Sequence, residues 1–311
     1  MNICDTYWQK NGLIYTPQNE TSWWKTHGMA PAAYMYDQHT IRIFQGCWDE
    51  HGISRIGYVD VSADNPRQIL GKSMDPVIDI GDPGCFDDNG VFPGHVYSIN
   101  NKVYLYYTGF QKLDKIPFSN FSGLAISVDG GNTFHRVSKA PIMDRADEGL
   151  YTRAGISVIV KDDIFRACYS VGSDWAYVAG KKRPVYEVNY IESSNGIDFG
   201  KNGRCIVQCN RTVEHGLGRP QIIIIDDVYY VFYTRRLNDY KYHMGVSRSC
   251  DLIKWERIDE WLSTITYGSP SEFDSEMVYF PCVVNTGAKI FLFYSGNRYG
   301  GNGFGFATLI K

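Results

Sequence analysis

Long apolar runs are missing from this 311-residue sequence, which excludes the helical membrane proteins. No stretch approaches the roughly 18 consecutive apolar residues that a membrane-spanning helix needs. Residues 1–10 have neither a basic segment nor an apolar core, so we expect no signal peptide and a cytoplasmic location. A convincing long amphipathic helix is missing as well. The regular structure of this chain must therefore come mainly from strands.

An excess of charge and a metal-binding cysteine pattern are also missing. The net charge is −3, from 31 Lys and Arg against 34 Asp and Glu, so nothing favours nucleic acid or an anionic membrane as a partner. The eight cysteines form no CxxC pair and no zinc-ligand spacing, and we predict neither a metal nor a cofactor. Free thiols in a reducing compartment are expected, with a small set of disulfides as the alternative.

Aromatic residues are what the sequence has in abundance. They make up 15% of the chain, with 23 Tyr and 7 Trp, and hydrophobic residues reach 44%. This richness is typical of β-sheets, and also of sugar-binding sites, where flat rings stack on the apolar faces of sugars.

One strand pattern recurs five times along the chain. Each repeat has a short apolar strand, a tight turn, a second strand rich in Tyr and Phe, and a third strand marked by a small residue. Four strands per repeat at a spacing of roughly 45–60 residues is typical of β-propeller blades. The first two strands of the repeats are predicted at residues 29–34 and 41–44, 90–96 and 103–109, 154–160 and 165–170, 218–224 and 229–235, and 279–284 and 290–296.

The sequence therefore predicts an all-β, single-domain, five-bladed β-propeller with four-stranded antiparallel blades. Fourth strands are expected at residues 141–144 in the second blade and 205–208 in the third. The fifth blade lacks a fourth strand, so we predict that residues 12–17 supply it by pairing with residues 304–309, which would hide an open edge. The predicted blades span residues 24–80, 86–145, 150–210, 213–267, and 274–311 together with 12–17.

Charged and aromatic residues gather at one predicted rim of this propeller. The first strand of a blade begins at the same mouth of the channel at which the antiparallel second strand ends. The opposite rim carries ordinary turns, so we expect a functional funnel at the first rim, although single residues there could instead start turns or link blades. The candidate site residues are His27, Asp49, Asp87, Asp88, Arg153, Asp174, Trp175, Glu214, Arg219, Arg235, Asp274, Glu276 and Asn297.

Two kinds of chemistry fit these residues. Carboxylates that face each other in an aromatic pocket suit the cleavage of a glycosidic bond, where one acid protonates the leaving oxygen and one carboxylate activates water or attacks. Arginines complicate this interpretation because they depress the pKa values of acids. They suit instead a phosphate, a carboxylated sugar or a nucleotide.

Four motifs resemble a known clan of enzymes: GCFDDNGV at residues 84–91, GLAIS at 123–127, GRP at 218–220 and FDSEM at 273–277. They are similar to the five-bladed propeller glycosidases of families 32, 43, 62 and 68 and to the family 130 mannoside phosphorylases. The chain also resembles the N-terminal domain of plant glucosamine inositolphosphorylceramide transferases. The resemblance covers nearly the whole chain and implies a carbohydrate or glycoconjugate substrate.

The sequence departs from this clan in its catalytic residues. Family 43 places an Asp base at the start of the first blade, where this chain has His27 and no carboxylate, and the nucleophile motif of family 32 is absent. The catalytic trio of the clan therefore cannot be carried over intact.

Three functions remain open. In a glycoside hydrolase, Asp88 would be the base or nucleophile, Glu214 the general acid, and Glu276 a carboxylate that tunes pKa values or binds sugar. In a phosphorylase or glycosyl-transfer enzyme of surface-glycan metabolism, arginines would hold a phosphate or nucleotide, with Arg153, Arg219, Arg235 and Arg236 as candidates. The third function is a sugar-binding propeller that has lost catalysis, for which the missing first-blade Asp is the best argument.

Overall fold

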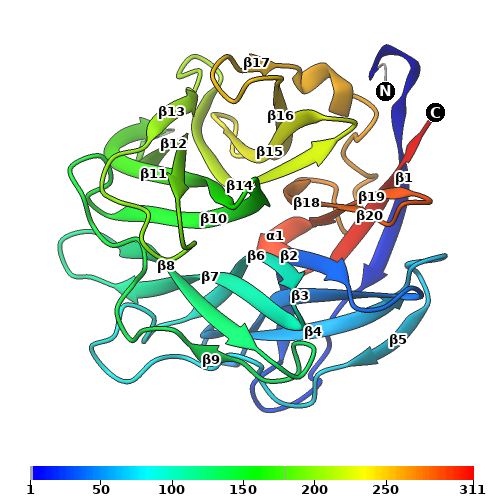
Figure 1. The fold of residues 1–311 in the computed structure, drawn as a ribbon, viewed down its shortest axis with the longest axis horizontal. Helices are drawn as coiled ribbons and strands as arrows, with labels where there is room; N and C mark the ends of the chain where they lie inside the picture. Colours follow the sequence, from blue (N-terminus) through cyan, green and yellow to red (C-terminus); the bar gives the residue numbers. More distant parts are fainter. Residues whose placement is uncertain (1–2, 179) are drawn as a thin grey trace.

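The computed structural model describes residues 3–178 and 180–311, and strands form most of this part of the chain. Twenty strands are arranged around a common centre (Figure 1). The described helices are η1 (Ile3–Asp5), η2 (Asp259–Leu262) and α1 (Asn297–Gly300). None of them is long and apolar enough to cross a bilayer.

The strand pairings fall into five antiparallel runs of four strands, which we name units I to V. Unit I contains β2 (Thr26–Met35), β3 (Thr40–Trp48), β4 (Ser54–Ser62) and β5 (Ile69–Lys72), and unit II contains β6 (Val91–Ile99), β7 (Lys102–Lys112), β8 (Phe118–Ser127) and β9 (His135–Arg136). Unit III contains β10 (Thr152–Lys161), β11 (Ile164–Val178), β12 (Lys181–Ser193) and β13 (Arg204–Val207). Unit IV contains β14 (Glu214–Ile225), β15 (Val228–Leu237), β16 (Tyr242–Ser249) and β17 (Glu256–Arg257), and unit V contains β18 (Tyr279–Asn285), β19 (Ile290–Ser295), β20 (Phe304–Ile310) and β1 (Tyr7–Tyr15).

The N-terminal strand completes unit V, as the sequence predicted. Strand β1 pairs antiparallel with β20, and the two ends of the chain lie side by side in Figure 1. The strand is longer than expected and earlier, because it runs over Tyr7–Tyr15 rather than residues 12–17. Trp8 explains the extension: its ring is fully buried and contacts the rings of Phe232 and Trp261 in unit IV.

The fourth strand of unit II was predicted wrongly. It is the short β9 at His135–Arg136, and residues 141–144 contribute one isolated bridge, from Met143 to Ser122. The physical reason is an ion pair at 2.9 Å between Arg136 and the buried Asp87, which fixes β9 against the unit. The fourth strand of unit III at Arg204–Val207 agrees with the prediction.

The core is divided among the joints between neighbouring units. Each of five clusters of buried side chains draws its members from two units that are adjacent around the centre. The two faces of each unit therefore pack against different neighbours: one face contacts the preceding unit and the other face contacts the following unit. Representative pairs are Phe44 and Tyr107 for units I and II, Tyr106 and Ile156 for II and III, Val188 and Leu217 for III and IV, Trp261 and Tyr294 for IV and V, and Phe293 and Ile43 for V and I.

The first strands of the units, β2, β6, β10, β14 and β18, contact one another in a closed ring. Each has a β-bulge against its second strand at the same place in the unit. Four of the bulges contain a residue with positive φ, and in unit IV this residue is Arg219, with φ 42°. Its guanidinium donates hydrogen bonds to carbonyl oxygens of three other inner strands, at Ala30, Pro31, Pro93, Gly94 and Pro281. This side chain fills the centre of the ring.

A ring of hydroxyl groups links the bulges of successive units. The Thr108 hydroxyl of unit II accepts from the Gly155 N–H of unit III, and the same contact recurs at the next three joints. The recurring acceptor and donor pairs are Ser170 with Arg219, Thr234 with Phe280, and Ser295 with Ala30. Units I and II lack this contact, because Gly46 has no hydroxyl and the facing Pro93 has no N–H.

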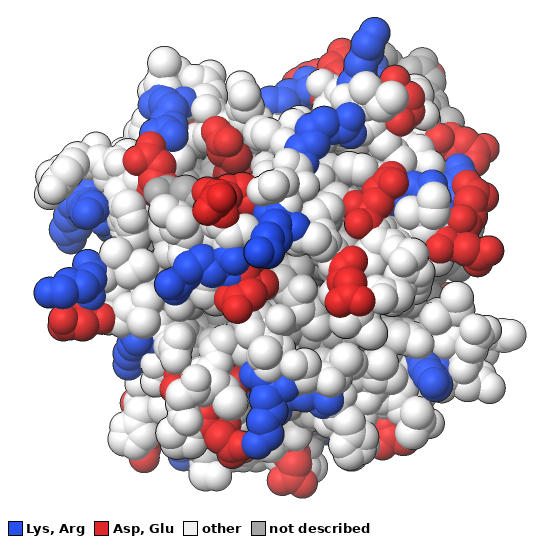
Figure 2. All heavy atoms as spheres, turned by 60° about the vertical axis from the view of Figure 1, so that its left-hand side comes forward, with Lys and Arg blue, Asp and Glu red and all other residues white. Residues whose placement is uncertain are grey.

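Charges of both signs are interspersed on the face of the molecule that Figure 2 shows. That face lies over units II and III, to the left in Figure 1. It carries no continuous patch of one sign, which agrees with the nearly balanced composition.

Candidate functional site

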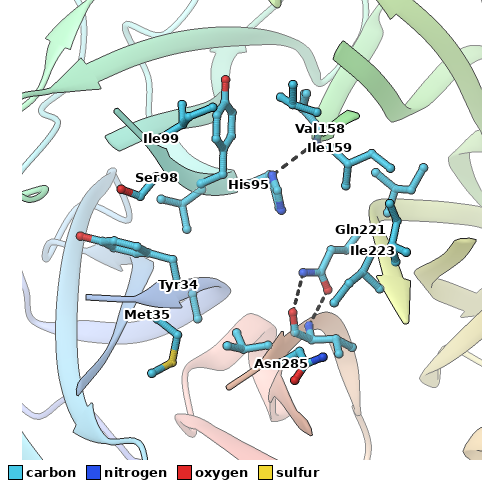
Figure 3. A pocket seen from close by; sticks show the side chains of 18 residues that line it. Tyr34, Met35, His95, Ser98, Ile99, Val158, Ile159, Gln221, Ile223 and Asn285 are labelled. Carbon is cyan, nitrogen blue, oxygen red and sulfur yellow. Dashed lines mark hydrogen bonds between the residues drawn. The ribbon is translucent and has the colours of Figure 1, made fainter. Parts of the chain in front are cut away.

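The central channel has a cavity at each mouth. We call the mouth at which β2, β6, β10, β14 and β18 begin the front mouth, and the mouth at which they end the rear mouth. The rear cavity, of about 550 Å³, is lined by the last residues of these strands (Figure 3). Its polar side chains are tied to neighbouring strands: Nδ1 of His95 accepts from the Val158 N–H, and the Gln221 amide donates to the Val283 carbonyl at 2.9 Å. His95 and Gln221 therefore link the inner strands to one another.

The front mouth holds a cavity of about 360 Å³ that adjoins a smaller one of about 60 Å³ deeper in the ring. Aromatic and cationic side chains dominate the lining, and the bulges form its floor. The lining of the two cavities includes Trp48, Phe92, Phe110, Lys112, Phe118, Asn120, Arg183, Tyr186, His215, Arg219, Arg236, Tyr242, Phe280 and Tyr299. No Asp or Glu is among the described residues that line these two cavities.

Two of the predicted site carboxylates, Asp87 and Asp274, are buried in interactions within their units. Tyr107 donates to Asp87 at 3.2 Å, and Tyr294 donates to Asp274 at 2.8 Å. Each carboxylate also has a cation, Arg136 for Asp87 and Lys10 for Asp274. Units III and IV repeat the arrangement with the pairs Tyr169–Glu148 and Tyr233–Asp259. The recurrence indicates a structural role, in which a carboxylate holds the tyrosine of the second strand.

Glu214 is fully buried and lies in an ionic network rather than in the front cavity. Arg235 and Arg257 contact it at 2.7 and 2.8 Å, and it lines a separate cavity of about 270 Å³. Burial alone would raise the pKa of Glu214, but the hydrogen bonds from Arg257 and Arg235 outweigh it and hold this pKa below its usual value. A general acid at neutral pH needs the opposite shift, so this environment does not favour the predicted role.

Asp88 takes part in no ion pair between described residues, which distinguishes it from the carboxylates above, although one oxygen of Asp274 likewise has no hydrogen-bond partner. One oxygen of Asp88 accepts from the Gly84 N–H at 2.8 Å, whereas the other is buried and makes no hydrogen bond in the described structure. Asp88 also precedes Asn89, which lines the front cavity. The third catalytic candidate, Glu276, is exposed, and its backbone N–H donates to Asn297.

The remaining predicted residues have partners that hold loops and strands in place. Asp49 caps a turn and pairs with Arg55 at 2.8 Å. Arg153 pairs with Glu148 at 2.8 Å. Further contacts of this kind are made by exposed Asp174 with Arg211, Trp175 with the ring of Tyr151, and Asn297 with the backbone of Glu276 and Met277.

His27 stands behind the wall of the front cavity. Its ring stacks on Trp48 with centroids 3.9 Å apart, and Trp48 lines the cavity. Burial lowers the pKa of His27 to about 4, so the imidazole is neutral at physiological pH. Two residues that the sequence analysis proposed line the front cavities themselves: Arg219 lines the smaller cavity, and Arg236 lines both. The expectation that Asp88, Arg153, Glu214 and Glu276 share one cavity with Arg219 is therefore not met.

The sequence analysis missed Lys112, Arg183, Tyr242 and Tyr299 in this lining. Lys112 ends β7, and Arg183 lies in the hairpin of β11 and β12, whose strands of 15 and 13 residues are the longest in the described chain. The length of the β11–β12 hairpin could have indicated Arg183, because strands this long project past the other strands of their unit.

Several solved structures that share this fold are described as glycoside hydrolases or glycosidases. A glycosyl hydrolase from Bacteroides ovatus superposes with a TM-score of 0.71 at 14% identity, covering 97% of this chain and 92% of that one. A thermostable family-43 glycoside hydrolase gives 0.63 at 14% identity over 97% and 91%. An alpha-L-arabinofuranosidase from Lactobacillus brevis gives 0.67 at 9% identity over 91% and 90%. The chain thus has the fold of the propeller glycosidases, as its motifs predicted.

Sequence comparison leads to two proteins of Mycobacterium tuberculosis. The uncharacterized proteins Rv1502 and MT1551 are each 28% identical to this chain over 304 residues, which cover 97% of this chain and 99% of each relative. No model of a known protein family matches the sequence.

Proposed function

We propose that this protein is a carbohydrate-active, five-bladed β-propeller that binds a glycoside in the front cavity. The closed ring of five inner strands, each with the same bulge, supports the blade count. The observation that carries the function is the aromatic wall of the cavity. Its volume of about 360 Å³ lies at the small end of the range of about 300–1,000 Å³ that is usual for ligand pockets.

The aromatic wall is held rigid by its own contacts. Trp48 is fixed by the stacked ring of His27, and Phe110 packs against Phe118 with centroids 5.3 Å apart. Elsewhere in the lining, the Tyr242 and Tyr299 hydroxyls lie 3.3 Å apart. Rigid ring faces around a small cavity suit the apolar face of a sugar, while the tyrosine hydroxyls offer hydrogen bonds to its edge.

Hydrolysis of the bound glycoside is a second proposed function, and Asp88 is the observation that favours it. This carboxylate keeps one oxygen without a hydrogen bond and adjoins a residue of the cavity wall. Asp88 would then act as the base. Glu276 would be the better acid candidate of the two, because Glu214 is held ionised by two arginines. The fold that the chain shares with glycoside hydrolases supports the same chemistry.

A titration and a turnover assay test the two proposals separately. Binding of methyl glycosides is followed by calorimetry with the parent protein, Trp48→Ala and the matched control Trp255→Ala, whose ring lies outside the cavity. We expect Trp48→Ala to bind the glycoside with an affinity about tenfold or more lower than the parent, and Trp255→Ala to keep the affinity of the parent. Turnover of aryl glycosides, with and without phosphate, is measured with the parent and Asp88→Asn. Equal binding by Trp48→Ala would contradict the site, and full activity of Asp88→Asn would contradict the base.

A further inference from the structure

Three cations line the front cavity without a carboxylate among its described lining residues. Lys112 comes from unit II, Arg183 from unit III and Arg236 from unit IV, so they approach the cavity from three different units. The chain as a whole has a net charge of −3. This local excess of positive charge is therefore not a consequence of composition.

Arg236 is held in place by aromatic rings instead of by an acid. Its guanidinium carbon lies 4.6 Å from the centre of the Tyr186 ring and 5.6 Å from that of the Tyr242 ring. The neighbouring Arg235 has two carboxylate partners, Glu214 and Asp259, whereas Arg236 takes part in no ion pair between described residues. Stacking leaves the N–H groups of a guanidinium available for a planar or tetrahedral anion.

Unpaired polar groups lie beside this guanidinium. His215 is 4% exposed, and its Nδ1 is buried without a hydrogen-bond partner in the described structure. The side-chain oxygen of Asn120, another lining residue, is also buried and without a partner. Burial, followed by the charge of Arg236, lowers the pKa of His215 to about 4, so the ring is neutral near pH 7. The hydroxyls of a sugar in the cavity can donate to the Asn120 oxygen, and a neutral imidazole such as that of His215 can donate or accept.

We propose that Arg236, with Arg183 and Lys112, forms a subsite for an anionic group, a phosphate or a carboxylate, carried by the sugar that the front cavity binds. This inference rests on the proposed function and names the class of its ligand. A glycoside with such a group would place its ring against the aromatic wall and its anion on the side of units III and IV. Neutral sugars would leave the cation cluster unpaired and would bind less tightly.

Calorimetric titration with matched ligands tests the subsite. The probes are methyl glucoside, methyl glucuronide, glucose 1-phosphate and inorganic phosphate, each titrated into the parent, Arg236→Gln, Arg183→Gln and Arg248→Gln. Arg248 is the matched control, because it belongs to the same unit but pairs with Glu256 on the surface. We expect at least one charged sugar to bind about tenfold or more tighter than the neutral one, and Arg236→Gln and Arg183→Gln to reduce this preference. The control should keep it.

The outcomes separate the subsite from the wider function. Equal affinity for neutral and charged sugars, or an unchanged preference in both cavity variants, would overturn the subsite and leave the glycoside proposal standing. Binding of inorganic phosphate that depends on Arg236, without binding of any sugar, would support an anion site at Arg236 but overturn both the glycoside proposal and the assignment of the anion to a sugar. The affinities of methyl glucuronide and glucose 1-phosphate show whether the subsite binds a carboxylate or a phosphate. If Arg236→Gln does not fold, which its melting curve will show, Arg183→Gln at the edge of the cavity decides the test.

Discussion

Replacing Arg219 with methionine tests whether one guanidinium holds the centre of the ring together. Methionine keeps an unbranched stem and removes every N–H that reaches the carbonyls of units I, II and V. Three nitrogens make these contacts, and a hydrogen bond from a charged group contributes about 1.5–3 kcal/mol, so the gross loss is roughly 5–9 kcal/mol. Methionine carries no charge, so the variant no longer bears the cost of burying the guanidinium, and this offsets several kcal/mol of the gross loss.

The expected net loss is about 3–5 kcal/mol of the free energy of unfolding, because the carbonyls lose their charged donor while the cost of burying the charge is removed. Urea and thermal denaturation of the parent, Arg219→Met and Arg219→Lys measure it. Lysine keeps the charge but has three donors on one nitrogen, so Arg219→Lys should fall between the other two. Arg248→Met, which removes a surface ion pair, should stay within about 1 kcal/mol of the parent. An Arg219→Met protein as stable as the parent would refute the reasoning.

Three further predictions concern the rest of the ring. Trp8→Ala should destabilise the protein by about 3–5 kcal/mol, because a fully buried ring leaves the joint of units IV and V; a melting curve unchanged from the parent would show that β1 is not part of the closure. Thr234→Val should cost about 1–3 kcal/mol, since the Phe280 N–H loses its acceptor, whereas Thr286→Val in an exposed turn should cost less than about 0.5 kcal/mol. Glu214→Gln should change the pH dependence of unfolding: the lowered pKa of Glu214 stabilises the fold above the ordinary carboxyl pKa, and this contribution disappears as pH falls toward the folded-state pKa. The stability difference between parent and Glu214→Gln should therefore shrink on acidification below about pH 4.5, and a constant difference would contradict the assignment.

The repeated strands could be predicted from the sequence because their signals are local. Each unit contains an apolar strand followed by a Tyr-rich one, and the turn between them lies within a few residues of both. The closing strand could also be predicted, since the C-terminal part of the chain supplies only three strands of unit V. The position of β9 could not be predicted, because it depends on the pairing of Arg136 with Asp87, which lies 49 residues earlier.

The candidate site was predicted less well, because its charged residues also pair with residues far away in the sequence. Rim position indicated Arg219 and Arg236, which line the front cavities, but it did not show which charged residues would be neutralised by partners from other strands. Glu214 meets Arg257 from β17, and Asp274 meets Lys10 from the other end of the chain. Arg235 and Arg236 are adjacent in sequence, but successive side chains of a strand point to opposite sides. Arg235 is therefore paired with acids, whereas Arg236 lines the cavity.

The guanidinium at the centre of the ring also decides how a ligand can travel. Because Arg219 and the carbonyls that it binds close the channel between the two mouths, the front cavity is a blind pocket and not a tunnel. A polysaccharide cannot thread through the molecule, and whatever enters at the front must leave by the same opening. For the glycoside that we propose as the ligand, such a pocket suits the end of a glycan, a short branch or a free sugar.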